Sequence, residues 1–337
     1  MALRTIGAGT MILVTGGAGF IGSNLVAGLA GAGLDPVAVC DMFGHDAKWK
    51  NLAKHPVHEV VDPTELPLFL DQCGTAIEAV FHMGAISATT ETDVDLIMRT
   101  NLTLSQSLWR FCIDADCPFI YASSAATYGD GSQGFADDND PTALAALRPL
   151  NPYGWSKKLF DDFAIAESAA GNAPPFWAGL KFFNVYGPNE YHKGGQRSVA
   201  HQLFEQIRDT GQVKLFKSHH PDYGDGGQLR DFVHVDDCVK LMIWLLRDRP
   251  ESGVYNCGTG KARSFKDLAL AAFAAMDKEA KIDFIDTPEA IRRHYQYFTE
   301  ADMTRVRGAG YDANVMSLED GVAGYIKDFL ATDDPYR

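Results

Sequence analysis

The sequence predicts an α/β fold whose core is a doubly wound parallel sheet. Short apolar runs alternate with longer amphipathic stretches in the first half of the chain, which is typical of repeated β-α-β units. The first apolar run ends in a glycine-rich turn, and the second ends in Asp41. Because 337 residues exceed the usual size of one domain, we also expect a smaller α/β part.

The glycine-rich turn predicts a dinucleotide site. The run from Gly16 to Gly22, with its triplet Gly17, Gly19 and Gly22, lies between the apolar run 11–14 and a helix expected over residues 23–30. Such a turn lets the backbone approach a pyrophosphate, which then faces the N-terminus of the helix. A glycine triplet alone could be merely a tight turn. Asp41, however, follows the next run, where a carboxylate binds an adenosine ribose, so we predict a Rossmann-like sheet.

The remaining elements follow in order. Parallel, buried strands are predicted over residues 11–14, 37–40, 58–61, 79–82, 119–122 and 177–182, with a helical stretch near 93–115. After about residue 183 the pattern loosens, and loops are expected over 187–195 and 218–227. We therefore assign residues 1–183 to the dinucleotide-binding domain, with segments at about 230–258 returning to it, and 184–337 mainly to an interleaved substrate-binding domain.

Composition narrows the class of protein. The chain is 46% hydrophobic and 22% charged, as in an ordinary globular protein, and its formal net charge of −14 opposes binding to nucleic acid or an anionic membrane. Its six cysteines form no Cys-x-x-Cys pair and are expected to be buried thiols. No signal-peptide layout and no apolar run of roughly 18 residues is found, so we expect a cytoplasmic protein.

Two segments carry groups suited to hydride chemistry. Ser123 and Ser124 end the predicted strand at 119–122, at the edge where open parallel sheets bind ligands. Tyr153 and Lys157 are four residues apart and so share one face of a helix. An ammonium and a cationic nicotinamide both favour phenolate, so we expect the pKa of Tyr153 to be lowered toward working pH. Tyr153 could then accept a proton from a substrate hydroxyl.

The loop expected over residues 218–227 contains residue types that bind metals. His219 and His220 lie close to Asp222 and Asp225 in the sequence. Their spacing matches no regular ligand pattern, so we predict a polar loop near phosphates and no metal.

These residues carry a family resemblance. The turn from Gly16 to Gly22, Ser124 and the Tyr153/Lys157 pair resemble the extended short-chain dehydrogenase/reductases, which modify nucleotide sugars. More narrowly, the chain resembles the ADP-L-glycero-D-manno-heptose 6-epimerase family over almost its full length, in segments 11–24, 84–91, 122–129, 182–194 and 295–302. The most specific segment is 184–194, where His-Lys-Gly at 192–194 is characteristic of the heptose epimerases.

The resemblance implies a bound NADP. The positions that match cofactor contacts are Gly16, Gly19, Phe20, Ile21, Gly22, Asp41, Met42, Lys48, Met83, Gly84, Ala85, Ile86, Ser87, Asn101, Tyr153, Lys157 and Val185. NAD stays possible, because Asp41 repels a 2′-phosphate and Met42 replaces an expected asparagine. We expect Lys48 to bind that phosphate while the Asp41 carboxylate rotates away.

The resemblance also implies the substrate site and the reaction. Substrate contacts fall on Ser124, Asn184, Lys193, Gly195, Gln202, Phe216, Lys217, Ser218, His219, Arg230 and Tyr295. Gly195 and Gln202 depart from the expected serine and histidine, and the segment 217–228 looks longer than in the family. The implied catalytic residues are Ser124, Tyr153, Lys157 and Lys193.

The implied activity is inversion of carbon 6 of an ADP-heptose by a homo-oligomeric isomerase of lipopolysaccharide inner-core synthesis. Two alternatives remain open. One is a different epimerase or a dehydratase acting on a UDP- or GDP-sugar, although Ala125 and Ala126 stand where a dehydratase needs acidic groups. The other is a dinucleotide-binding sensor without catalysis, which would not need Ser124, Tyr153 and Lys157.

Overall fold

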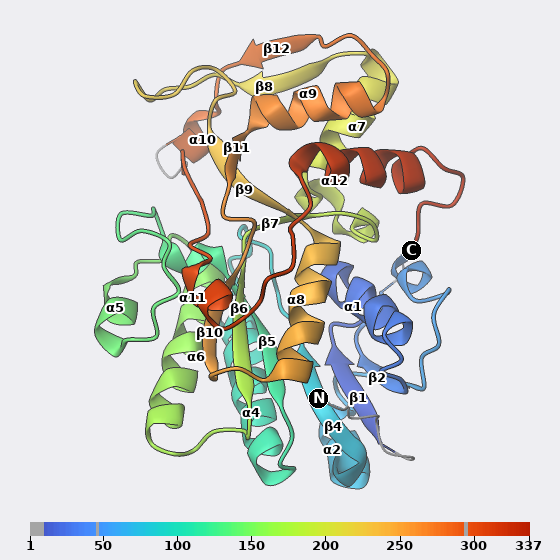
Figure 1. The fold of residues 1–337 in the computed structure, drawn as a ribbon, viewed down its shortest axis with the longest axis vertical. Coiled ribbons are helices and arrows are strands. Elements are labelled where there is room, and N and C mark those ends of the chain that lie inside the picture. The colour runs from blue at the N-terminus through green and yellow to red at the C-terminus, as the bar shows by residue number, and fades with distance from the viewer. Residues whose placement is uncertain (1–9, 45–46, 293–295) are drawn as a thin grey trace.

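The large sheet of the protein confirms the predicted fold class. The computed structural model describes residues 10–44, 47–292 and 296–337. Seven parallel strands pair in the order β10-β6-β5-β4-β1-β2-β3, with helices on both sides (Figure 1). The strands are β1 (Met11–Thr15), β2 (Val37–Cys40), β3 (Glu59–Val61), β4 (Ile77–His82), β5 (Phe119–Ser124), β6 (Trp177–Phe182) and β10 (Gly253–Cys257).

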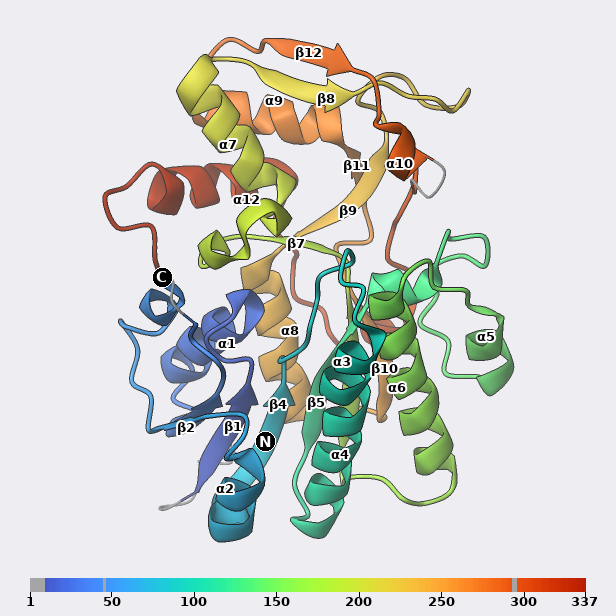
Figure 2. The ribbon, with the colours of Figure 1, turned by 180° about the vertical axis from the view of Figure 1, so that it is seen from behind.

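Successive side chains of each strand enter two different cores, as the pleat of a strand requires. In β1, Ile12 and Val14 join the core beneath α1 (Phe20–Gly31) and α8 (Val235–Asp248). Met11 and Leu13 join the opposite core, beneath α2 (Leu66–Cys73), α4 (Leu104–Asp114) and α6 (Pro152–Ala169), which lie in front in Figure 2. Burial on both faces explains why these strands are continuous apolar runs.

The predicted strands all form, with one difference in burial. Glu59 and Val60 of β3 are exposed, because β3 is an edge strand that only β2 pairs. The seventh strand, β10, was not among the predicted ones. It is buried throughout, but Tyr255 and Asn256 interrupt its apolar pattern, so the sequence pattern does not predict a buried strand there.

The smaller part of the molecule lies above the large sheet in Figure 1. It contains a three-stranded sheet of β7 (Asn184–Tyr186), β9 (Leu229–His234) and β11 (Ala262–Ser264), and a pair of β8 (Val213–Phe216) and β12 (Ile282–Ile285). A third core joins these strands to α7 (Val199–Thr210), α9 (Phe265–Ala275) and α12 (Leu318–Tyr325). Between β9 and β11 the chain returns to the large sheet as α8 and β10, so the two parts are interleaved.

The other described elements are short. They are η1 (Ala47–Asn51), η2 (Gly74–Ala76), α3 (Val94–Ile97), the π-helix η3 (Met98–Thr103), η4 (Ala125–Tyr128), α5 (Pro141–Ala146), η5 (Tyr191–Gln196), α10 (Glu289–Arg292), α11 (Thr304–Gly308) and η6 (Ile326–Leu330). Within the described ranges, no helix has the length and apolar character needed to cross a bilayer. The six cysteines are all free thiols.

Candidate active site

The turn after β1 has no room for a side chain. Gly16 has φ +67°, and a Cβ on it would lie 2.5 Å from the Cα of Gly84. A Cβ on Gly22 would lie 2.1 Å from the carbonyl oxygen of Gly16. Gly19 caps α1 and donates its N–H to that same carbonyl over 3.0 Å. Bare backbone and a helix N-terminus therefore meet at the sheet edge, a cradle that fits a dinucleotide pyrophosphate.

Asp41 follows β2 and is held by three donors. One carboxylate oxygen accepts the N–H of Ala18 over 2.9 Å. The other accepts the N–H of Met42 over 2.7 Å and pairs with Lys48 Nζ over 2.6 Å. These donors hold the Asp41 carboxylate in place in this structure. Lys48 does lie beside it, as the sequence predicts, and also donates to the carbonyl of Met42 over 2.7 Å.

The segment after β4 is fixed by one buried asparagine. Asn101 lies in the π-helix η3, accepts the N–H of Ile86 over 2.8 Å and donates to the Ile86 carbonyl over 3.0 Å. Its amide also donates to Ser156 Oγ over 3.1 Å, and Ser156 donates to the carbonyl of Tyr153 over 2.7 Å. Asn101 therefore links the predicted cofactor segment, residues 83–87, to the first turn of α6.

His82 at the end of β4 is a site residue that the sequence analysis missed. It is buried, with Nδ1 2.6 Å from Thr15 Oγ1 and Nε2 2.9 Å from Ser105 Oγ. Burial, with a smaller effect from the Lys157 charge, lowers the pKa of His82 to about 3. A neutral imidazole therefore links Thr15 on β1 to Ser105 on α4 at physiological pH, beside the predicted cofactor segment. Its place at a strand end next to the predicted segment 83–87 was the available signal.

Ser124 and Tyr153 come together because two backbones pack closely. Ser124 is the last residue of β5, and Tyr153 lies in the first turn of α6. A Cβ on Gly154 would lie 2.7 Å from the carbonyl oxygen of Ala126, so the glycine lets α6 begin directly against the chain after Ser124. The Ser124 hydroxyl acts on Tyr153 and lowers the pKa of its phenol. Lys157 lies one turn further along α6 and is buried.

Burial shifts the pKa values of Tyr153 and Lys157 in opposite directions. Burial raises the pKa of Tyr153, the hydrogen bond with Ser124 opposes this, and the Asp161 charge adds to it. Burial lowers the pKa of Lys157 to about 8, while Asp161 acts in the opposite direction. The expectation of a lowered Tyr153 pKa is therefore wrong for the groups that the structure contains, because burial of the phenol has the largest effect.

Lys193 reaches the same region from the other part of the chain. It lies in η5, and its Nζ is 5.4 Å from the ring centroid of Phe20, the first residue of α1. Burial lowers the pKa of Lys193 and the Glu190 charge opposes this. Glu190 is fully buried and accepts hydrogen bonds from Ser198 Oγ over 2.6 Å and from Tyr325 Oη over 2.9 Å. Glu190 therefore fixes the loop that carries Lys193.

Arg230, a predicted substrate residue, lies next to a cavity of the structure without lining it. Arg230 on β9 donates to the carbonyls of Leu229 and Gln296, and Gln296 donates to the carbonyl of Gly129. These contacts connect the smaller part to the turn that follows Ser124. A cavity of about 520 Å³ opens here, lined by Asp130, Gly131, Phe135, Leu150, His220, Asp222, Tyr223, Gln296, Tyr297 and Phe298.

The structure places the predicted substrate-contact residues in more than one region. Phe216 to His219 end β8 and begin the following loop, where the N–H of His219 donates to Tyr297 Oη over 3.2 Å. Gly195 and Gln202 line a second cavity of about 380 Å³, and Gln202 donates to the carbonyl of Arg197 over 2.8 Å. Tyr295 lies outside the described residues.

Comparison with known proteins gives consistent matches. Residues 12–258 match the NAD dependent epimerase/dehydratase family. ADP-L-glycero-D-manno-heptose-6-epimerase of Nitratidesulfovibrio vulgaris is 49% identical over 331 residues, which cover 97% of this chain and 100% of the relative. The crystal structure of ADP-L-glycero-D-manno-heptose-6-epimerase of Helicobacter pylori is similar, with a TM-score of 0.77, 28% identity and coverage of 97% of this chain and 99% of the other. MoeE5 in complex with UDP-glucuronic acid and NAD has a TM-score of 0.71 and 28% identity, with 95% and 98% covered.

The cradle makes a testable prediction about dinucleotide retention. Gly22→Ala should reduce the nicotinamide dinucleotide bound to the purified, folded protein by about tenfold, because the turn must shift to admit the methyl group. Extraction of the cofactor and chromatography measure this content. Gly31→Ala, at the other end of α1 with nothing within 4 Å of its Cβ, is the matched control and should keep the wild-type content. Equal retention in the two variants would contradict the prediction.

Proposed function

The chain belongs to the NAD dependent epimerase/dehydratase family and, within it, to the ADP-L-glycero-D-manno-heptose-6-epimerases; we propose that it inverts carbon 6 of ADP-D-glycero-D-manno-heptose to give the L-glycero epimer. The proposal rests on one observation above the others. Ser124, Tyr153 and Lys157 lie together at the carboxyl end of β5 and the start of α6, and Lys193 from the heptose-epimerase motif lies 5.4 Å from the ring of Phe20, directly after the glycine turn.

The chemistry of the substrate explains why a nicotinamide is needed. Carbon 6 carries a secondary alcohol, and no neighbouring carbonyl makes its C–H bond acidic. A nicotinamide dinucleotide supplies hydride removal and return, so that the alcohol passes through a ketone and the cofactor is unchanged after each cycle. Inversion requires the ketone to present its opposite face before hydride returns.

The residues of the large sheet serve the first face. Tyr153 accepts the hydroxyl proton as hydride leaves the carbon, and Ser124 donates a hydrogen bond to the reacting oxygen. Lys157 holds the ribose and stabilises the phenolate form of Tyr153 by its charge. Lys193 serves the second face, since it reaches the cradle from a different part of the chain and can exchange a proton with the opposite side of the ketone.

We assign NADP as the preferred dinucleotide. The family supports a nicotinamide dinucleotide, and the choice between the two forms rests on Lys48. Its Nζ lies 2.6 Å from Asp41, so the pair is close to neutral and a 2′-phosphate meets less repulsion than a lone carboxylate would impose.

Two further expectations belong to this proposal. The exposed apolar side chains of Val94, Leu96 and Trp155 on α3 and α6 support self-association into a homo-oligomer, which light scattering would test. The six free thiols support a reducing cytoplasmic location. A panel of ADP-, UDP- and GDP-sugars separates the heptose epimerase from the alternative nucleotide-sugar enzymes and from a sensor, which would turn over none of them.

Tyr153→Phe tests the proton transfer at the first face. The variant should keep its fold and its cofactor but lose epimerase activity by roughly two to four orders of magnitude, the usual contribution of general acid–base catalysis. The same assay in deuterated water checks the hydride route: the product of the wild-type enzyme should carry no deuterium on carbon. Near-normal turnover by Tyr153→Phe, or deuterium on carbon 6, would refute the mechanism.

Lys193→Met tests the second face. The side chain keeps its bulk and loses its proton donor, so kcat should fall by about a hundredfold while the cofactor stays bound. A lysine that only anchors a substrate phosphate would behave differently, because uniform binding raises KM and spares kcat. An unchanged kcat at saturating substrate would therefore remove Lys193 from the proton-transfer groups.

Lys48→Ala tests the choice of dinucleotide. Loss of a charged hydrogen bond to the 2′-phosphate should weaken NADP by about ten- to a hundredfold and leave NAD nearly unchanged. Calorimetric titration of both cofactors measures the difference. Lys50→Ala, two residues further along η1, is the control and should alter neither affinity. Equal weakening of both cofactors by Lys48→Ala would show that Lys48 does not read the phosphate.

A further inference from the structure

Two oppositely charged residues are buried behind the candidate active site, and the proposed mechanism uses neither. The side chains of Asp161 on α6 and Lys181 on β6 are 0% and 1% exposed, and Lys181 Nζ lies 3.1 Å from Asp161 Oδ2. An ion pair removed from water in this way needs additional hydrogen bonds to be tolerated. The partners that supply these bonds reveal what the pair holds in place.

Asp161 ties α6 to β5. Its Oδ1 accepts the hydroxyl of Tyr121 over 2.9 Å, and its Oδ2 accepts the hydroxyl of Ser123 over 2.7 Å. On α6, Asp161 follows Lys157 by one turn and Tyr153 by two, so all three share one face of the helix. On β5, Ser123 immediately precedes Ser124. One carboxylate thus connects the helix of the proposed base to the strand of the proposed serine.

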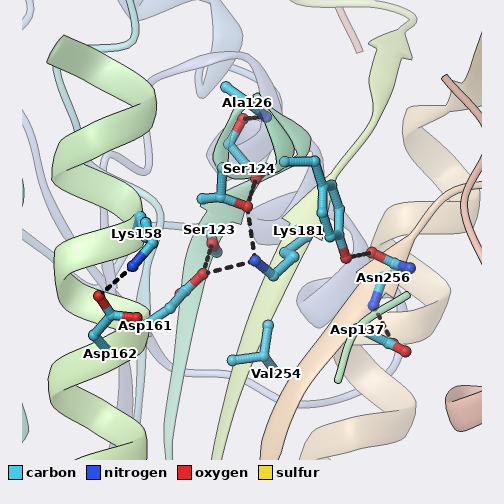
Figure 3. Close-up of polar contacts among 12 residues, drawn as sticks. Ser123, Ser124, Ala126, Asp137, Lys158, Asp161, Asp162, Lys181, Val254 and Asn256 are labelled. Atoms are coloured by element: carbon cyan, nitrogen blue, oxygen red, sulfur yellow. Dashed lines mark hydrogen bonds and ion pairs between the residues drawn. The ribbon is translucent and has the colours of Figure 1, made fainter. Parts of the chain in front are cut away.

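Lys181 continues the connection to the backbone of Ser124. Ser123 and Lys181 are register partners in adjacent strands, and Figure 3 shows the Lys181 ammonium between the Asp161 carboxylate and the end of β5. Lys181 Nζ donates to Thr127 Oγ1 over 2.7 Å, and Thr127 donates to the carbonyl of Ser124 over 2.8 Å. The ammonium also lies 4.6 Å from the ring centroid of Tyr128.

We propose that Asp161 and Lys181 are positioning residues, which fix Ser124 relative to Tyr153 and Lys157 through a buried ion pair that adds no net charge beside the proton-transfer groups. The inference rests on the proposed function, because it assigns a role in the reaction of Ser124 and Tyr153. Neither residue touches the substrate; both act through the groups that do.

The neutrality of the pair matters because of what surrounds Tyr153. The ionisable groups of this cluster are linked to one another: Asp161 contacts Tyr121 and Lys181, the Lys181 ammonium lies over the ring of Tyr128, and the charge of Lys157 acts on His82. The Asp161 carboxylate raises the pKa of Tyr153 and favours the charged form of Lys157. Lys181 Nζ lies 3.1 Å from Asp161 Oδ2 and offsets part of that negative charge, so the effect on Tyr153 should grow when Lys181 is removed.

Lys181→Met separates the electrostatic role from a structural one. The variant keeps the aliphatic chain and leaves the Asp161 carboxylate without its counter-charge. The acid limb of the kcat profile should move to higher pH, so that kcat on this limb falls about tenfold while KM is unchanged. Adding Asp161→Asn removes the uncompensated charge. The double variant should return the acid limb to the wild-type pH, although its plateau kcat stays lower because Ser124 has lost its link to α6.

The next carboxylate on the same helix provides a matched control. Asp162 pairs with Lys158 over 2.6 Å, but its side chain is 35% exposed and contacts neither strand residue (Figure 3). Asp162→Asn should therefore leave the pH profile and kcat unchanged. The inference is overturned if Lys181→Met keeps the wild-type acid limb, if the double variant keeps the shift, or if the double variant has the wild-type plateau. The double variant buries no charge, so it decides the question even if Lys181→Met does not fold.

A second measurement separates this inference from the proposed substrate. The tyrosinate absorbance of each protein, minus that of the same protein carrying Tyr153→Phe, reports the pKa of Tyr153 without any substrate. It should rise in Lys181→Met and return in the double variant. If the wild-type protein does not epimerise the ADP-heptose while this titration follows the expectation, the proposed function fails and the inference stands. If the wild-type enzyme is active but the pKa of Tyr153 is the same in all the variants, the inference is overturned and the proposed function stands.

Discussion

The cost of removing charged groups from water governs the arrangement of this site. Lys157, Asp161 and Lys181 are all nearly inaccessible to solvent, and each ion would lose several kcal/mol of hydration if nothing replaced it. Hydrogen-bonding groups on neighbouring elements replace this hydration. β5 places the hydroxyls of Tyr121 and Ser123 beside the Asp161 carboxylate, and η4 places the hydroxyl of Thr127 beside the Lys181 ammonium. The proposed proton-transfer groups thus lie next to a buried and hydrogen-bonded part of the large sheet.

The opposite wall of the site has a different construction. Lys193 comes from a short helical turn rather than from the sheet, and Glu190 anchors that turn to α7 and α12 through Ser198 and Tyr325. Arg230 and Gln296 form a second link, from β9 to the chain after β5. In the proposed mechanism, the two faces of the ketone would be served from a wall built on the large sheet and from a wall built on loops.

The sequence predicted the parts of the structure that depend on local pattern. Strands buried on both faces are continuous apolar runs, and a turn without side chains must be glycine, so β1, β2 and the cradle were found correctly. The charged core was not predictable in this way. Lys157 and Asp161, like Lys158 and Asp162, are separated by four residues on one helix, and the sequence alone does not tell the buried pair from the exposed one.

The same limit applies to the electrostatics. The spacing of Tyr153 and Lys157 predicted that they share a face, and α6 places them so. It did not predict the direction of the Tyr153 pKa in the protein, because desolvation depends on how much chain from β4, β5 and β6 closes around the phenol. The strand β10 was missed for a related reason: its burial is imposed by β6, α8 and α11, and its own residues include Tyr255 and Asn256.

The interleaved path of the chain has a consequence for biosynthesis. β6 is complete once Phe182 has been made, but its partner β10 begins only at Gly253, after β7, α7, β8 and β9 of the smaller part have been translated. Until then the nascent sheet ends in a buried-type strand whose backbone groups are unpaired on one side, an edge that recruits other chains. The interval between these two strands is therefore a stage of synthesis at which an exposed strand edge favours association with other chains.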